Sequence, residues 1–340
     1  MSRTSATTDG RERGCVRLLL GGDVMLGRGV NELIHRIGPE YPVEMLTPVT
    51  READLFFVNL ECAIYDRSEL FPGAAKAFYF RADPPAVQTL QAMGVHLVTL
   101  ANNHALDAGY DALLDTLAIL DAHNIAHAGA GENLAAARRA ACLTVGDIRF
   151  GIIAACDHQP DFAATDRSPG IHYVDLRDNA SIDALVNDAA ELARRVDHAI
   201  VSLHWQPNWA PRIAPRYHDV ARRLIDTGVR IIWGHSPHHF QGVEWFDNRV
   251  VIYSAGDLLD DYAVDANFRN DRQLLFEATV SAAGVERLRA LPIELEYAHP
   301  HPALPEAHTW ATLRLSALCA ELNSNVVGCD DGWLDIRPTK

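Results

Sequence analysis

The sequence predicts an α/β protein in which mixed β-sheets are covered by helices. Short apolar runs rich in β-branched residues alternate with helical patterns over the first two thirds of the chain. These runs are apolar at almost every position, as strands covered on both faces require. The pattern then changes to hairpins, and this order of elements indicates a mixed sheet system with helices outside.

Six strands and three helices are predicted in the alternating part of the chain. The strands are expected at residues 16–21, 54–59, 95–100, 148–154, 197–203 and 229–234. The helices are expected at residues 111–123, 178–195 and 216–228. Leu113, Leu117 and Leu120 fall on one face of the first helix, which favours packing of that face against a sheet.

Two hairpins, a helix and a strand are predicted in the C-terminal part. The hairpins turn at Asp247-Asn248 and at Gly284 because these residues favour tight turns. A helix near 306–323 and a strand near 332–337 follow. No repeat or linker divides the sequence, so we expect one domain over residues 15–340, preceded by a flexible arm at residues 1–14.

Charge and hydropathy argue against several kinds of partner. The chain has 30 Lys and Arg against 45 Asp and Glu, and the net charge of −15 disfavours nucleic acid or an anionic membrane as the main partner. No window approaches the roughly 18 apolar residues of a membrane span, and the polar N-terminal residues with a brief apolar run do not predict a signal peptide. We therefore expect a cytoplasmic protein, whose scattered cysteines fit reduced thiols.

Side chains suited to metal binding follow five of the predicted strands. In α/β folds, ligands bind at the loops that leave the carboxyl ends of strands. A mixture of carboxylate, carboxamide and imidazole groups favours Mn, Fe or Zn over Ca or Mg, which prefer oxygen ligands. The residues are Asp23, Asn59, Glu61, Asn102, Asn103, His104, His204, His235, His238 and His239.

Each of these residues also has a structural interpretation. Asp23 could cap the helix beyond it, and Glu61 could be a solvated residue at a strand end. Asn102 and Asn103 could form a turn or a helix cap, since Asn is favoured at both. A lone histidine such as His204 is more often a hydrogen-bonded structural residue than a ligand.

Three further histidines have weaker links to a site. His239 is expected to be a bystander, because adjacent side chains in an extended segment point to opposite faces. His158 and His172 stand in a loop that could cover the site.

Several motifs together resemble the CapA-type proteins of poly-γ-glutamate capsule biosynthesis. In chain order they are GDVMLGR, VNLE, LANNHALDAG, SLHW, GHSPHHFQGVE and VIYSAGD, which span about residues 16 to 260. The resemblance places the chain within the wider calcineurin-like metallophosphoesterase superfamily. It implies a sandwich of two mixed β-sheets flanked by helices.

The same resemblance implies a metal-binding role for six residues and a substrate-facing role for His104. Asp23 would bind one metal and Glu61 would stand at the bridging position. Asn103 would bind the second metal beside His104. The remaining implied ligands are His204, His235 and His238.

Two departures from the superfamily pattern leave the number of metals open. Met25 stands where a histidine is usual, which leaves Asp23, Glu61 and His238 at the first position. The closing pair, His235 and His238, is spaced by two residues instead of one. We therefore expect one or two divalent transition metals, either Mn, Fe or Zn.

Five other residues are candidates for contact with a substrate. Arg28, and Arg81 in the family-like block FYFRADPP, could clamp an anionic group. Asn102 and Asp257 are expected at the cleft. Trp205 could wall the pocket or be a core aromatic.

These features support two enzymatic hypotheses and one non-enzymatic hypothesis. The preferred one is a metal-dependent hydrolase of a phosphoester or a related small anionic substrate, in which the metal activates water and His104 serves the leaving group. The alternative is a role on poly-γ-glutamate, γ-glutamyl or other amide compounds. The third is a non-catalytic assembly partner, which would not need ligand-type residues at five strand ends.

Overall fold

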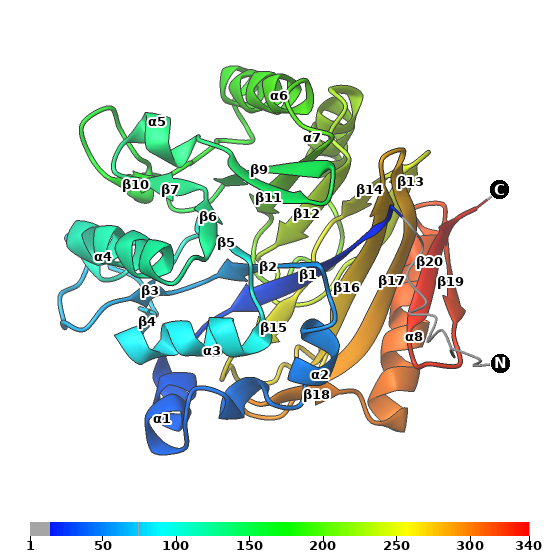
Figure 1. Cartoon of the computed structure of the whole chain (residues 1–340), viewed down its shortest axis with the longest axis horizontal. Coiled ribbons are helices and arrows are strands. Elements are labelled where there is room, and N and C mark those ends of the chain that lie inside the picture. The colour runs from blue at the N-terminus through cyan, green and yellow to red at the C-terminus, as the bar shows by residue number, and fades with distance from the viewer. Residues whose placement is uncertain (1–13, 74, 340) are drawn as a thin grey trace, which may run out of the picture.

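The computed structural model describes residues 14–73 and 75–339 and contains two β-sheets that stack face to face, with helices on their outer sides (Figure 1). The predicted fold class, a sandwich of two mixed sheets flanked by helices, is confirmed. Residues 1–13, which make up nearly all of the predicted arm, lie outside the described residues.

The first sheet is mixed and is built around β1. Its order is β19-β20-β17-β16-β1-β2-β5-β6, with β15 also paired to β1 and β18 to β17. β1 runs parallel to β2 and β15 but antiparallel to β16. The strands are β1 Val16–Val24, β2 Leu55–Leu60, β5 Leu97–Thr99, β6 Ala126–Ala128, β15 Asp257–Leu259, β16 Arg272–Ser281, β17 Gly284–Leu295, β18 Pro300–Pro302, β19 Ser324–Gly328 and β20 Leu334–Pro338.

The second sheet is also mixed and has the order β13-β14-β12-β11-β9-β8. Its strands are β8 Ala141–Val145, β9 Ile148–Cys156, β11 His198–His204, β12 Ile231–His235, β13 Val243–Phe246 and β14 Arg249–Ile252. Two small ladders pair β3 Ala63–Ile64 with β4 Arg81–Ala82, and β7 Ala130–Gly131 with β10 Gly170–Ile171. All six predicted strands and both hairpins are present.

The core between the sheets consists of inward-facing side chains from both of them. Leu20 and Phe57 of the first sheet share this core with Ile200 and Trp233 of the second. Trp233 Nε1 donates a hydrogen bond of 2.9 Å to the carbonyl of Gly21, which links the two sheets directly beneath the polar strand ends. The position of one sheet relative to the other is therefore set by close packing.

Helices cover the outer faces of both sheets. Leu33 of α1, Leu90 of α3 and Leu113 of α4 pack with the first sheet. Leu185 of α6 and Leu224 of α7 pack with the second sheet, where these helices lie side by side (Figure 1). The helices are α1 Arg28–Arg36, α2 Thr47–Thr50, α3 Val87–Met93, α4 Gly109–Ala122, α5 Leu134–Ala137, α6 Asn179–Ala193, α7 Pro215–Asp226 and α8 Pro305–Ala320.

The C-terminal part departs from the prediction in its short strands. Leu315 and Cys319 of α8 join the core between the sheets, as the predicted C-terminal helix allows. β15, β18 and β19 were not predicted, because none of them contains an apolar run of more than two residues. No helix within the described residues is long and apolar enough to cross a membrane.

Candidate metal centre

Four strands end at one edge of the sandwich and bring the predicted ligands together. Asp23 lies near the end of β1, and Glu61 directly follows β2. His204 and His235 are the last residues of β11 and β12, where they pair in register. All four side chains are buried.

A bulge in β1 turns Asp23 toward the second sheet. Leu18 and Leu20 face the core between the sheets, whereas Leu19 faces the helices. The register with β2 shifts between Leu20 and Asp23, and Val24 consequently joins Leu19 on the helical side. In a regular strand Asp23 would itself point toward the helices.

The histidines of the second sheet need only regular alternation. Ile200, Ser202 and His204 lie on the inner face of β11, and Trp233 and His235 lie on the inner face of β12. Apolar inner residues therefore give way to polar ones where each strand leaves the core.

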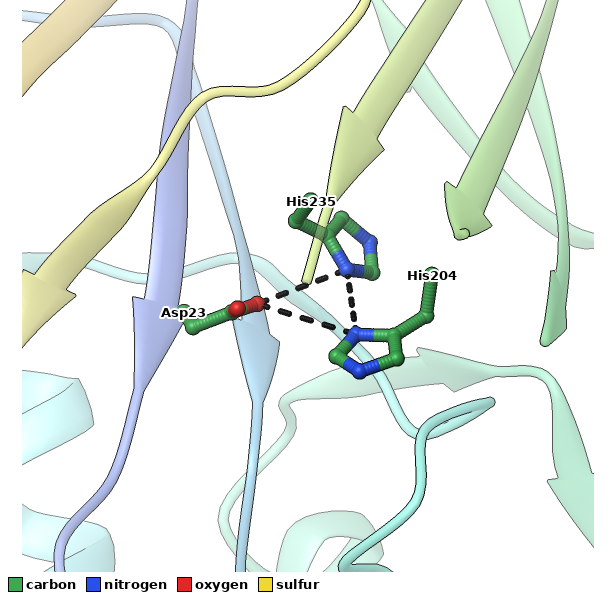
Figure 2. Close-up of side chains that lie close together, drawn as sticks. All are labelled: Asp23, His204 and His235. Carbon is green, nitrogen blue, oxygen red and sulfur yellow. Dashed lines mark hydrogen bonds and ion pairs between the residues drawn. The ribbon is translucent and has the colours of Figure 1, made fainter. Parts of the chain in front are cut away.

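Asp23, His204 and His235 form a first group of potential metal ligands (Figure 2). The Nδ1 atoms of the two histidines are 2.9 Å apart, and Asp23 Oδ1 lies 3.4 Å from that of His235 and 3.9 Å from that of His204. Ser202 Oγ lies 2.8 Å from Nε2 of His235, and Asn103 Oδ1 lies 2.9 Å from Nε2 of His204. Both Nδ1 atoms are thus directed at one point beside a carboxylate.

Asp23, Glu61 and His238 form a second group. His238 Nδ1 lies 3.1 Å from Asp257 Oδ1, and the Tyr262 hydroxyl donates a 3.4 Å hydrogen bond to Glu61. Asp23 therefore belongs to both groups. The resemblance had given the bridging position to Glu61.

The loop after β12 holds these ligands in an uncommon backbone conformation. Ser236 and His238 have φ angles of 109° and 61°, in the left-handed region that non-glycine residues rarely adopt. The Ser236 amide donates a 3.2 Å hydrogen bond to Asp23 Oδ2. Local strain of this kind persists where the surrounding structure enforces it, and it is concentrated at functional sites.

Burial strongly disfavours charge at this edge. It raises the pKa of Asp23 to about 8, with repulsion from Asp257 as a further cause, and raises the pKa of Asp257 to about 8. It lowers the pKa of His235 to about 3 and that of His204 well below its usual range. Several buried acids beside neutral imidazoles form a donor set that a divalent cation stabilises, so these residues fit a metal.

Met25 contributes no ligand to either group. Its side chain lies in the core beneath the helices, and its sulfur accepts a 3.1 Å hydrogen bond from the amide of Gly27. Because Met25 replaces the usual histidine, three ligands were expected at this metal position. These three residues, Asp23, Glu61 and His238, lie together.

His104 is oriented by a carboxylate three residues later. Its Nδ1 lies 2.5 Å from Asp107 Oδ2, and its ring stacks on Phe80 with centroids 4.0 Å apart. Burial lowers the pKa of His104 to about 4, so its imidazole is neutral near pH 7. With Nδ1 bonded to Asp107, Nε2 is the nitrogen left for a substrate.

The two asparagines of the same loop have different partners. Asn103 contacts His204, as described above. Asn102 donates to Asn59 Oδ1 and to the Leu60 carbonyl, and its own Oδ1 accepts from the amide of His104. The structure thus places Asn102 as a support for the loop, with its side chain buried.

Trp205 lies on the far face of the second sheet from His204. It is completely buried in the core under α6 and α7, stacks on Tyr253 and donates a 2.8 Å hydrogen bond to the Tyr253 carbonyl. Its position is that of a core aromatic and not of a pocket wall, because successive residues of a strand point to opposite faces.

The two predicted arginines have protein partners. Arg28 Nε lies 3.4 Å from Asp261 Oδ2, and its guanidinium lies 5.8 Å from the ring centroid of Phe80, which stacks on His104. Arg81 donates to the Tyr65 carbonyl and to Asp83. Of the two arginines, Arg28 is therefore linked to the site, through its contact with Phe80 and the stacking of Phe80 on His104.

Of the three histidines with weaker links to a site, only His158 lies beside the ligand groups. His158 lies 3.4 Å from Ser236 Oγ and packs edge-on against His204, so it borders the first group. His172 bonds to the Ala154 carbonyl, and His239 bonds to the carbonyls of Phe240 and Ala210. Neither belongs to the two ligand groups.

Some residues of the centre were not singled out by the sequence analysis. Asp107 stands inside the motif LANNHALDAG, three residues after His104, and Asp260 stands three residues after Asp257. Their nearness to these candidates in the chain was a usable signal. Lys76 carried no signal, because it lies in a segment without periodicity.

With the geometry in place, comparison with known proteins identifies the family. The model of the bacterial capsule synthesis protein family PGA_cap matches residues 17–262. The chain belongs to this family. A Mycobacterium tuberculosis protein named as a probable polyglutamine synthesis accessory protein is 32% identical over 369 residues, covering 95% of this chain and 96% of the relative.

Other capsule synthesis proteins are more distant. The capsule biosynthesis protein CapA of Bacillus anthracis is 24% identical over 294 residues, covering 86% of this chain and 70% of the relative.

A structure described as a novel phosphatase from Mycoplasma pneumoniae has a TM-score of 0.50 at 12% identity, covering 87% of this chain and 96% of that one. This likeness shows that the chain shares its overall fold with that phosphatase.

Proposed function

We propose that this capsule synthesis family protein is a metal-dependent hydrolase of a phosphoester or a related small anionic substrate. The observation that carries the proposal is the convergence of two ligand groups on Asp23, beside an imidazole oriented by a carboxylate. Burial of several carboxylates at one place costs free energy. Binding of a divalent cation would offset that cost.

The chain offers ligands for one or two metals. Asp23, His204 and His235, with Asn103 next to His204, would hold the first. Asp23, Glu61 and His238 would hold the second. A bound Mn, Fe or Zn ion would supply Lewis acidity and lower the pKa of water at the centre.

His104 and Asp107 would serve the leaving group. Asp107 accepts the Nδ1 proton and fixes the ring, which leaves Nε2 of neutral His104 as an acceptor. An anionic substrate bound beside His104 would favour uptake of a second proton at Nε2, which the ring would then donate to the departing atom. Arg28 would bind the anionic part of the substrate, as an exposed guanidinium near Phe80 allows. Arg81 would require a change of partner to do so.

A role on poly-γ-glutamate or another γ-glutamyl amide is the second candidate. It is favoured by the names of the relatives, which refer to polyglutamine synthesis and capsule biosynthesis. The same centre would then act on an amide, or the fold would act as an assembly partner without turnover.

Metal content tests the proposal first. Protein purified without chelator should carry one or two equivalents of Mn, Fe or Zn by elemental analysis. His204→Ala and His235→Ala should lose this metal, whereas His127→Ala, which removes a histidine paired with Asp121, should keep it. Protein that stays metal-free after reconstitution with all three ions would refute the metalloenzyme.

Turnover separates the two candidate substrates. We expect hydrolysis of an aryl phosphate, with kcat lowered about 100-fold or more in His104→Ala, as loss of a general acid–base group predicts. Hydrolysis of a γ-glutamyl anilide alone would favour the amide function. Metal-loaded protein that turns over neither compound would favour the assembly role.

A further inference from the structure

Lys76 occupies an unusual place in both the sequence and the structure. Of the 30 lysine and arginine residues in the chain, only Lys76 and Lys340 are lysines. The side chain of Lys76 is 11% exposed, and its Nζ lies 2.5 Å from Asp107 Oδ1. A second hydrogen bond runs from Nζ to the carbonyl of Asn103.

The contacts of His104 decide how Lys76 acts. Lys76 Nζ lies 3.3 Å from His104 Nδ1, but Asp107 Oδ2 lies 2.5 Å from the same nitrogen. The shorter contact requires a proton on Nδ1 that is donated to Asp107, and Nδ1 cannot then accept from the ammonium group. Lys76 therefore reaches His104 through Asp107.

We propose that Lys76 is a positioning residue, whose ammonium group clamps the Asp107 carboxylate and the Asn103 main chain and thereby sets His104 and Asn103 relative to the metal centre. The inference rests on the proposed role of His104. The clamp joins the two functional parts of one loop, since Asn103 contacts His204 while His104 faces the substrate.

The same contacts fasten residues 76–80 to the loop that carries His104. Asp107 Oδ2 also accepts a 2.7 Å hydrogen bond from the Phe80 amide, and Phe80 stacks on His104. The Lys76 amide donates to the Tyr79 hydroxyl, and its ammonium lies 5.0 Å from the ring centroid of Phe162. Asp107 thus binds an ammonium, an imidazole and an amide at once, and loss of the ammonium would loosen both segments.

An arginine would not reproduce this arrangement. The lysine ammonium is a compact charge whose three donors can point at acceptors in different directions, whereas guanidinium donors lie in one rigid plane. The two acceptors of Lys76, a side-chain carboxylate and a main-chain carbonyl, come from different parts of the loop. We therefore expect the retained charge of Lys76→Arg to rescue little.

Amine labelling of the unaltered protein tests the clamp without any assay of turnover. The amines that acetic anhydride can acetylate are those of Lys76, Lys340 and the N-terminus, and mass spectrometry follows each separately. Two hydrogen bonds to Lys76 should slow its acetylation about ten- to 100-fold relative to the same lysine in urea-unfolded protein. Equal rates in native and unfolded protein would overturn the proposal.

Variants test the consequence for the loop and the chemistry. In Lys76→Met we expect faster amide hydrogen exchange over residues 100–109, and kcat for an aryl phosphate about ten- to 100-fold lower with KM changed by less than about threefold. Arg67→Met is the matched control, because it removes an exposed cation nine positions earlier in the chain. Lys76→Met that exchanges like the control would overturn the clamp.

The measurements separate this inference from the proposed function. If the unaltered protein turns over no phosphate, the proposed function fails, but labelling and hydrogen exchange still decide whether Lys76 orders the loop. If circular dichroism shows that Lys76→Met does not fold, Lys76→Arg replaces it, because this variant keeps the positive charge. Its hydrogen exchange and its kinetics are then compared with those of the unaltered protein. Activity and exchange in Lys76→Arg equal to those of the unaltered protein would contradict the geometric requirement for an ammonium.

Discussion

Asn59 shows how a single buried side chain prepares the metal centre. Its amide nitrogen donates a 2.7 Å hydrogen bond to Asp23 Oδ1, and its oxygen accepts from Thr99 and Asn102. One side chain thus joins the ends of β1, β2 and the loop after β5. The oxygen that it holds is also the one that faces His204 and His235.

Replacement of Asn59 tests this support. Asn59→Ala leaves buried polar groups without their partner, so we expect the free energy of unfolding to fall by about 1–3 kcal/mol and metal affinity to fall with it. Urea denaturation and metal titration measure the two effects. Asn325→Ala, on an exposed position of β19, should change neither, and equal stability of the two variants would remove the assigned role of Asn59.

At the scale of elements, the contact of β1 with β15 requires glycine. A Cβ atom at Gly22 would lie 2.0 Å from the carbonyl oxygen of Gly256, just before β15 begins at Asp257. The close approach brings Asp257 beside Asp23 in register. The same stretch of β1 contains the bulge that turns Asp23 inward.

Gly22→Ala should therefore separate the two strands. We expect it to destabilise the protein by about 1–3 kcal/mol, as overpacking of a close contact does, and to weaken metal binding by moving Asp257 and Asp23. Gly328→Ala is the control, because nothing lies within 4 Å of a Cβ at that position. Thermal unfolding of both variants, with and without metal, provides the measurement, and a Gly22→Ala protein as stable as Gly328→Ala would contradict the expectation.

At the scale of the whole molecule, the metal centre lies across the interface of the two sheets. Asp23 comes from the first sheet, and His204 and His235 come from the second. A metal bound by all three would tie the sheets together and stabilise the folded state in proportion to its binding. In the metal-free protein, the protonation of the buried acids makes the free energy of unfolding depend on pH.

The sign of this pH dependence follows from the raised pKa values. Burial raises the pKa of Asp23 and Asp257 to about 8 in the folded protein, whereas an unfolded carboxyl has a pKa of about 3.9. At these two acids the folded state holds more protons between about pH 4 and pH 8, so their contribution to stability falls as pH rises. Burial lowers the pKa of His204 and His235, whose contribution rises with pH up to the unfolded value of about 6.5, so we expect the net decline above that pH. Hydrogen bonding from Asn31 lowers the pKa of Asp83, so the contribution of Asp83 is complete above about pH 4 and adds no slope there.

Thermal unfolding in chelator should show this decline. We expect Tm of metal-free protein to fall by several degrees between about pH 6.5 and pH 8. Saturating Mn²⁺ should remove or reverse the decline, because metal binds the deprotonated ligands and its apparent affinity grows with pH. A metal-free protein that gains stability over this range would contradict the assigned pKa directions.

The sequence by itself determined the six strands of the alternating part and the set of polar residues at their ends. Short apolar runs between helical patterns indicate buried strands, and the residue types after them are visible without a structure. The carboxyl ends of neighbouring parallel strands share one edge, so the nearness of Asp23 to Glu61 and of His204 to His235 could be anticipated.

Only the tertiary structure decided how these side chains face one another. The bulge that turns Asp23, the membership of Asp23 in both ligand groups and the position of Trp205 in the outer core depend on register and packing. The clamp formed by Lys76 joins residues about 30 positions apart through a segment with no periodic pattern. Periodicity encodes which face of a strand is buried, whereas contacts between distant segments depend on how sheets and loops pack in space.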